Sequence, residues 1–236
     1  MSNPLLKDSV FESAERQLST MTISGTINKS ILLWLLLAAS AFFSWTHPGI
    51  IGPYVFAFLI GGLVLSMVTI FQKQLSPILS PLYALCEGFV LGVFSLYFEK
   101  SYPGIVVNAI LLTVCVLFCM LAAYKSGVIR ATPTFKKVII LSTLAIFAVY
   151  IIDMLLNLFG AGNFPYIHQS SGIGILISCA IVLIASFNLI LDFDLIEQAE
   201  QFRSPKFMEW YCAFSLMITL VWLYIEMLRL LSKMRD

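Results

Sequence analysis

Residues 105–124 read IVVNAILLTVCVLFCMLAAY, a run without a single charged side chain. An α-helix needs about 20 predominantly apolar residues to cross the roughly 30 Å hydrocarbon core of a bilayer. The strands of a membrane β-barrel would alternate polar and apolar residues, which this run does not do. Because lipid offers no hydrogen bonds to an open backbone, the run is predicted to be a transmembrane helix.

Six further apolar runs accompany it, at residues 31–45, 50–71, 78–98, 138–159, 173–191 and 210–231. Turn-forming residues separate several of them, for example HPG at residues 47–49 and PG at residues 103–104. The pattern predicts an all-α, polytopic membrane protein with about seven transmembrane helices. The transmembrane domain is predicted to cover residues 30–236, and the polar residues 1–29 are predicted to form an arm in the cytoplasm.

The composition excludes several classes of protein. Of the 236 residues, 60% are hydrophobic and only 11% are charged, with a net charge of +1. A soluble domain carries roughly 25% charged residues, so a lipid bilayer must surround most of this chain. A net charge this small offers no basic surface for nucleic acid. HExxH, GxSxG, Walker A and CxxC motifs do not occur, so we expect neither enzymatic activity nor a bound cofactor.

Lysine and arginine gather in alternate loops, which predicts the orientation because cytoplasmic loops carry an excess of both. The loops after the second, fourth and sixth runs hold Lys73, Lys125, Arg130, Lys136, Lys137, Arg203 and Lys206, whereas the opposite loops hold only Lys100. The N-terminus is therefore predicted to be cytoplasmic. An odd number of spans leaves Arg229, Lys233 and Arg235 outside, so either the last run does not fully cross or its tail snorkels to the interface.

Ionisable side chains inside a span are costly, so each is a candidate for function. Five carboxyl groups qualify: Glu87, Asp153, Asp192, Asp194 and Glu226. No cation lies within the helix of Glu87, so its partner must come from another helix unless the group is protonated. Glu226 precedes Arg229 by three residues and could pair with it on one helix face. Asp194 fits a wet interface, and Asp153 lies near the predicted outer end.

Paired carboxyl groups would give a membrane protein a response to pH. Two such groups facing each other in a low dielectric cannot both ionise cheaply, so they share a proton. When both ionise, their oxygens suit a hard divalent cation such as calcium. A proton-gated cation path is therefore physically reasonable here. The spacing of Gly88 and Gly92 is typical of close packing between membrane helices.

Three stretches carry a family resemblance. PLYALCEGFVLG at residues 81–92 follows the pattern P-x-Y-A-x-x-E-G-x-x-L-G, and NLILDFDLI at residues 188–196 places an aspartate four residues before an isoleucine. LYIEMLRLL at residues 223–231 is similar to L-Y-L-D-F-I-N-L-F, with Glu226 in the place of aspartate. Together they resemble the Bax inhibitor-1 family, also called the transmembrane Bax inhibitor motif family, in its bacterial branch. The similarity covers most of residues 31–231.

The resemblance implies six helices around a central seventh. It also implies a pH-sensing carboxylate pair near the cytoplasmic side, which in family members gates a calcium leak. By position the pair is Asp192 with Glu226, which would also be the calcium ligands, and Glu87 belongs to the same polar interior. The connection from Asp192 to Glu226 is longer than in the family pattern, so Asp194 could take the place of Asp192.

The leading prediction is a pH-sensitive, calcium-permeable leak channel in a bacterial inner membrane, with calcium and protons as its ligands. The alternative is a non-conducting regulator of stress or protein quality control that acts through a membrane partner such as a protease. Such a regulator would keep its activity when the buried carboxylates are neutralised, whereas a leak would lose its pH response. A proton-coupled transporter is a third possibility, and it would move its substrate against a gradient.

Overall fold

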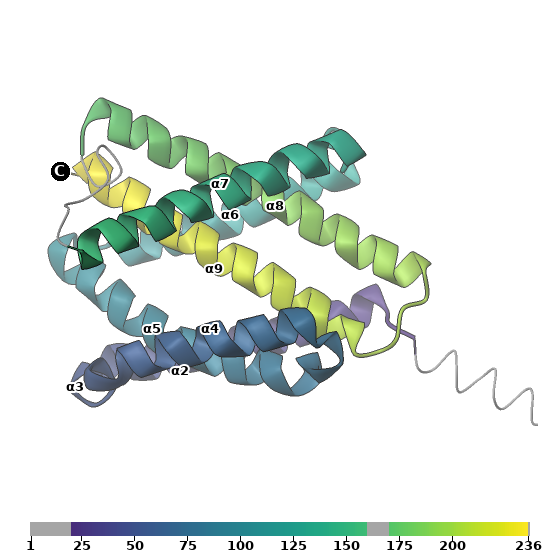
Figure 1. The fold of residues 1–236 in the computed structure, drawn as a ribbon, viewed down its shortest axis with the longest axis horizontal. Helices are drawn as coiled ribbons and strands as arrows, with labels where there is room; N and C mark the ends of the chain where they lie inside the picture. Colours follow the sequence, from purple (N-terminus) through teal and green to yellow (C-terminus); the bar gives the residue numbers. More distant parts are fainter. Residues whose placement is uncertain (1–19, 160–169, 236) are drawn as a thin grey trace, which may run out of the picture.

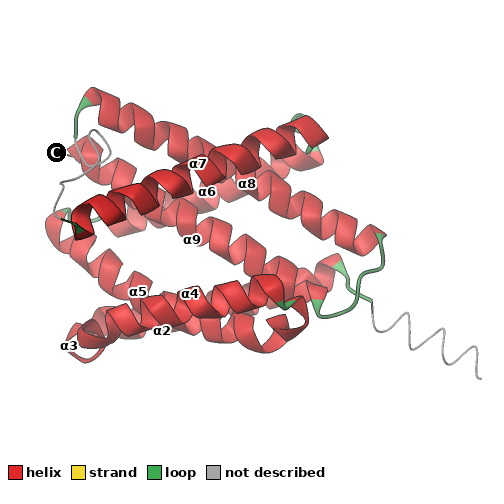
Figure 2. Cartoon of the chain, in the orientation of Figure 1, coloured by secondary structure: helices red, strands yellow, loops and turns green. Residues whose placement is uncertain are grey.

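Long helices joined by short loops form the computed structural model, which describes residues 20–159 and 170–235 (Figures 1 and 2). The long helices are α2 (Ile23–Thr46), α4 (Val55–Phe71), α5 (Ser76–Ser101), α6 (Ile105–Lys125), α7 (Pro133–Leu158), α8 (Gly172–Gln201) and α9 (Met208–Arg235). The short helices are α3 (Pro48–Ile51), η1 (Gly52–Tyr54) and η2 (Lys73–Leu75). Within the described residues, 7 helical segments are long and apolar enough to span a membrane, which confirms the predicted fold class.

The first helix begins earlier than its apolar run predicts. α2 starts at Ile23 instead of residue 31, because Thr22 caps it and accepts a hydrogen bond from the Gly25 amide at 2.9 Å. Such a cap satisfies an amide that the first turn of a helix leaves without a partner. Residues 23–29 of the predicted arm therefore belong to this helix, and residues 1–19 lie outside the described part of the chain.

α9 lies at the centre of the bundle, between a layer of α2, α4 and α5 and a layer of α6, α7 and α8 (Figure 1). It packs against α2, α5, α6 and α8, whereas α4 packs mainly on α5 and α7 packs mainly on α8. Apolar clusters fill both sides of α9: one contains Leu33 and Ala84, and the other contains Ala109 and Leu189. The expected central last helix is confirmed.

Gly88 and Gly92 bring α5 and α2 into backbone contact. A Cβ atom on Gly92 would lie 2.3 Å from the Ala41 carbonyl oxygen, and one on Gly88 would lie 2.4 Å from the Leu37 carbonyl oxygen. Only glycine allows two helices to approach so closely. The two glycines therefore serve helix packing, as their spacing predicts.

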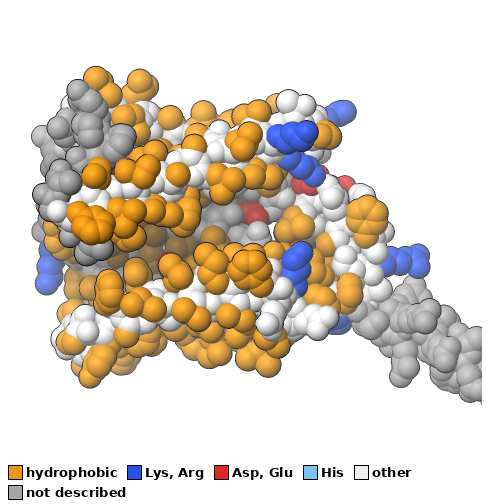
Figure 3. All heavy atoms as spheres, in the orientation of Figure 1, with side chains coloured by type: hydrophobic (Ala, Val, Ile, Leu, Met, Phe, Trp, Pro, Cys, Tyr) orange, Lys and Arg blue, Asp and Glu red, His pale blue; other side chains and the backbone are white. Residues whose placement is uncertain are grey.

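Apolar side chains cover the long sides of the bundle, as Figure 3 shows for one face. Phe56, Phe118 and Leu141 are 72%, 63% and 66% exposed, which suits contact with lipid tails. On the same face, acidic atoms are visible inside a hollow between the two layers (Figure 3). The exposed belt and the polar interior together fit a chain that a bilayer surrounds.

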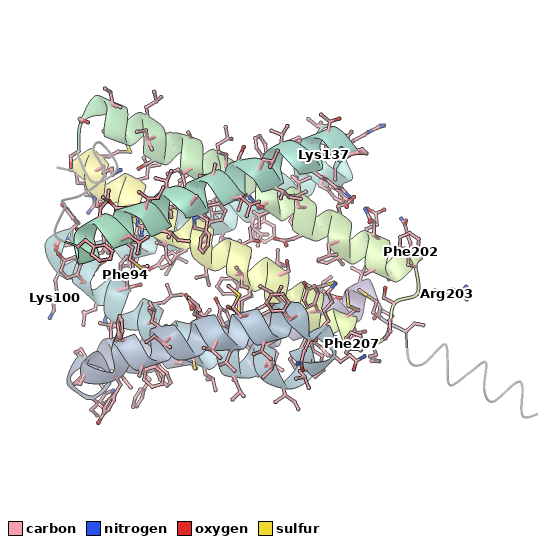
Figure 4. All side chains as sticks on the ribbon, in the orientation of Figure 1. Phe94, Lys100, Lys137, Phe202, Arg203 and Phe207 are labelled. Carbon is pink, nitrogen blue, oxygen red and sulfur yellow. The ribbon has the colours of Figure 1, made fainter. Side chains whose placement is uncertain are left out.

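Basic loops gather at one end of the bundle. Lys137 and Arg203 lie at the end where α2 begins, and Lys100 lies at the opposite end (Figure 4). We name these the N-terminal end and the C-terminal end of the bundle, after the start of α2 and the finish of α9. The loops predicted to be cytoplasmic thus share the N-terminal end, and their placement in the cytoplasm stays a prediction.

Candidate functional site

A stripe of polar side chains runs along one face of α9. Ser215, Thr219, Trp222 and Glu226 follow one another at intervals of four, three and four residues, which places them on one side of a helix. Thr219 donates a hydrogen bond to the Ser215 carbonyl at 3.3 Å, and Trp222 Nε1 donates to Glu226 Oε1 at 3.2 Å. This α9 stripe extends over about 16 Å, because each helical residue rises 1.5 Å.

Asp192 of α8 meets the α9 stripe at the end that lies nearer the N-terminal end of the bundle. The Ser215 hydroxyl donates to Asp192 Oδ1 at 2.6 Å, whereas the buried Oδ2 accepts no hydrogen bond. The residue is 6% exposed, and no lysine or arginine of the described residues forms an ion pair with it. A buried carboxylate with so few donors is costly when ionised. Of the acidic groups at the α9 stripe, Asp192 is therefore the one best placed to take up a proton or attract a cation.

Glu226 lies at the other end of the α9 stripe, where a neighbouring cation compensates its charge. Tyr150 Oη donates to Glu226 Oε1 at 2.8 Å, and Arg229 Nη1 donates to the same oxygen at 3.2 Å. The Arg229 guanidinium also lies 5.0 Å from the centre of the Tyr150 ring, in a cation–π contact. The predicted pairing of Glu226 with Arg229 is confirmed.

The structure does not bring Asp192 and Glu226 together. α8 and α9 pack side by side, and Asp192 lies opposite Ser215. Glu226 lies three turns further along α9, about 16 Å away along the axis. Because the helices are antiparallel, Glu226 lies opposite an earlier part of α8, and it lines the same cavity as Ile177 and Ile181. The predicted proton-sharing pair, and one calcium site built from both residues, are therefore not formed here.

Asp194 also lies apart from Glu226. Its carboxylate forms an ion pair with Lys136 of α7, and Gln198 Nε2 donates to it at 2.6 Å. These partners hold Asp194 on the α7 side of α8, away from the α9 stripe. Asp194 therefore does not replace Asp192 beside Ser215.

Glu87 and Asp153 occupy other faces of the bundle. Glu87 lies between α5 and α4, with its Oε2 3.6 Å from the position of a Cβ atom on Gly62. Its polar contact is with Tyr83 one turn earlier on the same helix, not with a group of another helix, and the alternative that Glu87 is protonated stays a prediction. Asp153 is buried on α7, one turn after Tyr150, near the Glu226 end of the stripe.

The described residues contain no cluster of three or more histidine, cysteine, aspartate and glutamate side chains that could hold a metal ion. Calcium prefers six to eight oxygen ligands, which the surroundings of Asp192 do not supply. Any calcium at this carboxyl would therefore keep much of its water.

The family model described as Bax inhibitor 1 like matches residues 3–236. The chain belongs to the Bax inhibitor 1-like family. No curated protein and no solved structure matches it. In this family member the motif at residues 81–92 builds the α2–α5 contact, whereas those at residues 188–196 and 223–231 carry Asp192 and Glu226. The predicted family is thus confirmed.

Glu209, near the start of α9, is a buried carboxylate that the sequence reasoning missed. It is 0% exposed, and its Oε1 accepts hydrogen bonds from the Thr22 amide at 3.1 Å and the Thr22 hydroxyl at 3.2 Å. Lys29 Nζ lies 3.4 Å from the other oxygen, at ion-pair distance without a hydrogen bond. In this family member Glu209 therefore ties the start of α2 to the start of α9.

Replacing Glu209 by glutamine should loosen this tie. The change keeps the shape of the side chain but removes the charge that Lys29 and the Thr22 amide contact, so we expect the free energy of unfolding to fall by roughly 1–2 kcal/mol. Thermal unfolding of the protein in detergent measures this. Glu200→Gln is the control, because Glu200 accepts from the Ile23 amide at 2.9 Å at a more exposed site. If both variants lost the same free energy of unfolding, the burial of Glu209 would not explain the effect.

Proposed function

We propose that this Bax inhibitor 1-like protein is a calcium-permeable leak, and that its conductance rises as Asp192 loses its proton. The α9 stripe supplies the polar route through an otherwise apolar bundle. The observation that carries the proposal is the buried Oδ2 of Asp192, which accepts no hydrogen bond. The protein acts without a cofactor and catalyses no reaction.

The expected direction of the pH response follows from the surroundings of Asp192. When this carboxyl ionises, only the hydroxyl groups of Ser215 and Thr219 on α9 are there to stabilise it, and the remaining charge must be solvated by water or by a cation. Ionisation of Asp192 therefore attracts water and cations toward the α9 stripe. Protonation removes the charge and with it the attraction, so the leak is low when Asp192 carries its proton.

The Glu226 end of the stripe acts separately, as a closure. Glu226, Arg229 and Tyr150 share hydrogen bonds and a ring contact at this end, and Glu226 is 1% exposed. An ion that passes must displace this group.

Calcium flux into liposomes that contain the full chain, across roughly pH 5 to 8, tests the proposal. Wild type should leak more at the higher pH. Asp192→Asn should stay near the low level throughout, at least roughly tenfold below wild type, because a charge within a membrane changes a barrier by more than about 1.4 kcal/mol. Asp194→Asn is the matched control on the same helix and should keep the pH response.

Two outcomes would reject the proposal in different ways. A wild-type protein that stays tight to calcium at every pH would exclude a leak and favour the non-conducting regulator. A leak whose pH response survives in Asp192→Asn would keep the channel but remove Asp192 as its sensor.

A further inference from the structure

A polar cavity lies at the C-terminal end of the bundle, where α5, α7, α8 and α9 meet. Its volume is about 270 Å³. Pockets for drug-sized ligands begin at about 300 Å³, so this cavity suits a small ion or a headgroup. Its charged lining side chains are Glu226, Arg229 and Lys233, and its lining serines are Ser170, Ser178 and Ser232.

The cavity carries more positive than negative charge. Arg229 is balanced by Glu226, with which it forms an ion pair at 3.2 Å. Lys233 instead donates to two neutral groups, the Ser178 hydroxyl at 2.7 Å and the Gly174 carbonyl at 3.2 Å. No carboxylate of the described residues pairs with Lys233. Glu226 lines the same cavity and attracts Lys233 from a longer distance, but it is already paired with Arg229. A half-buried cation that forms no ion pair of its own is unfavourable, so the site attracts an anion.

The same groups have hydrogen-bond donors to spare. A lysine ammonium has three donors, of which Ser178 and Gly174 take two. A guanidinium has five, of which one binds Glu226. The Ser178 hydroxyl accepts from Lys233 and keeps its own proton for a ligand. The first turn of α8, which holds Gly174, adds a partial positive charge.

We propose that this cavity binds a phosphate-type oxyanion through Lys233, Arg229 and Ser178. Phosphate oxygens accept several hydrogen bonds at once from arginine and lysine. Lys233 lies two residues before the end of α9, which is long and apolar enough to span a membrane, so the anion could be a phospholipid headgroup or a free phosphate. This site shares Arg229 with the closure of the α9 stripe, but binding of an anion there does not require conduction and can be measured without it.

Thermal unfolding of the full chain in a zwitterionic detergent tests the site in two series. In one series inorganic phosphate replaces chloride at constant ionic strength, and in the other phosphatidylglycerol replaces phosphatidylcholine in mixed micelles. The wild-type midpoint should rise with the anion in at least one series, as binding to the folded state requires. Lys233→Gln should need roughly tenfold more anion for the same rise.

Two further variants separate this binding from a general effect of charge or from damage to the fold. Lys233→Arg keeps the charge and should restore the response. Lys100→Gln removes an exposed cation at the same end and should behave as wild type. A rise with phosphatidylglycerol alone would identify a lipid headgroup, and a rise with phosphate alone a soluble anion. The proposal is overturned if neither series raises the unfolding midpoint of wild type. It is also overturned if the midpoint of Lys233→Gln rises as much as that of wild type, or if Lys100→Gln reduces the rise as much as Lys233→Gln does.

Discussion

Replacing Gly88 by alanine is expected to lower the free energy of unfolding by roughly 3 kcal/mol, the upper part of the usual range for overpacked sites. The added Cβ atom would lie 1.9 Å from Ser40 Oγ and 2.4 Å from the Leu37 carbonyl oxygen. The serine could rotate, but the carbonyl belongs to the α2 backbone and cannot move alone. α2 and α5 must therefore separate, and thermal unfolding in detergent should show a lower midpoint.

Gly61→Ala is the matched control for this change. Gly61 lies on α4, and a Cβ atom there would meet nothing within 4 Å. Alanine favours a helix over glycine by about 1 kcal/mol, so this variant should be as stable as wild type or slightly more so. If Gly88→Ala were as stable as Gly61→Ala, the close contact between α2 and α5 would be wrong.

Replacing Arg229 by glutamine is expected to destabilise the protein by roughly 2 kcal/mol. Removing one partner of a fully buried ion pair costs about 3–5 kcal/mol, and we expect less here because the Arg229 side chain is 39% exposed. Glu226 would keep Tyr150 and Trp222 as donors but lose its counter-charge. The variant should also leak more at rest, because the closure of the α9 stripe is weakened.

A double-mutant cycle separates the pair from its surroundings. Adding Glu226→Gln to Arg229→Gln removes the unpaired charge, so the double variant should recover much of the lost stability. Thermal unfolding of the four proteins under one set of conditions gives the coupling between the two residues. A double variant that loses the sum of both single effects would show that the pair contributes no coupling.

The spans could be predicted closely because lipid imposes one requirement on every long apolar run. The run at residues 105–124 became α6, Ile105–Lys125, almost without change. The helix predicted from the run at residues 173–191 was too short, because Asp192 and Asp194 were interpreted as the edge of the membrane. α8 instead continues to Gln201, and within this extension Asp194 forms an ion pair with Lys136 of α7.

The contacts between helices could not be predicted in the same way. Whether Asp192 meets Glu226 depends on the register of α8 against α9, which the loop at residues 202–207 and the length of α8 determine together. Glu209 was missed because a carboxylate just before an apolar run looks exposed. Its burial depends on Thr22 and Lys29, which lie far away in the sequence.

The basic tail of α9 finds partners that composition alone does not reveal. α9 continues to Arg235, and within it Lys233 donates to the Gly174 carbonyl while Arg235 Nη1 donates to the Pro103 carbonyl at 2.8 Å. Arg229, Lys233 and Arg235 are the cations that do not fit the predicted orientation. Glu226 pairs with Arg229, and backbone carbonyl groups accept hydrogen bonds from the other two. The last run is long enough to cross the membrane with this tail in place.

Asp192 and Glu226 act as separate sites if the register seen here persists while the protein conducts. Calcium flux across pH in liposomes that contain wild type, Asp192→Asn, Glu226→Gln or the double variant tests this most directly. We expect the two changes to alter the logarithm of the flux independently, so that their effects add in the double variant. A double variant that matches either single variant at every pH would mean that the two carboxyl groups share one proton, and would contradict their separation.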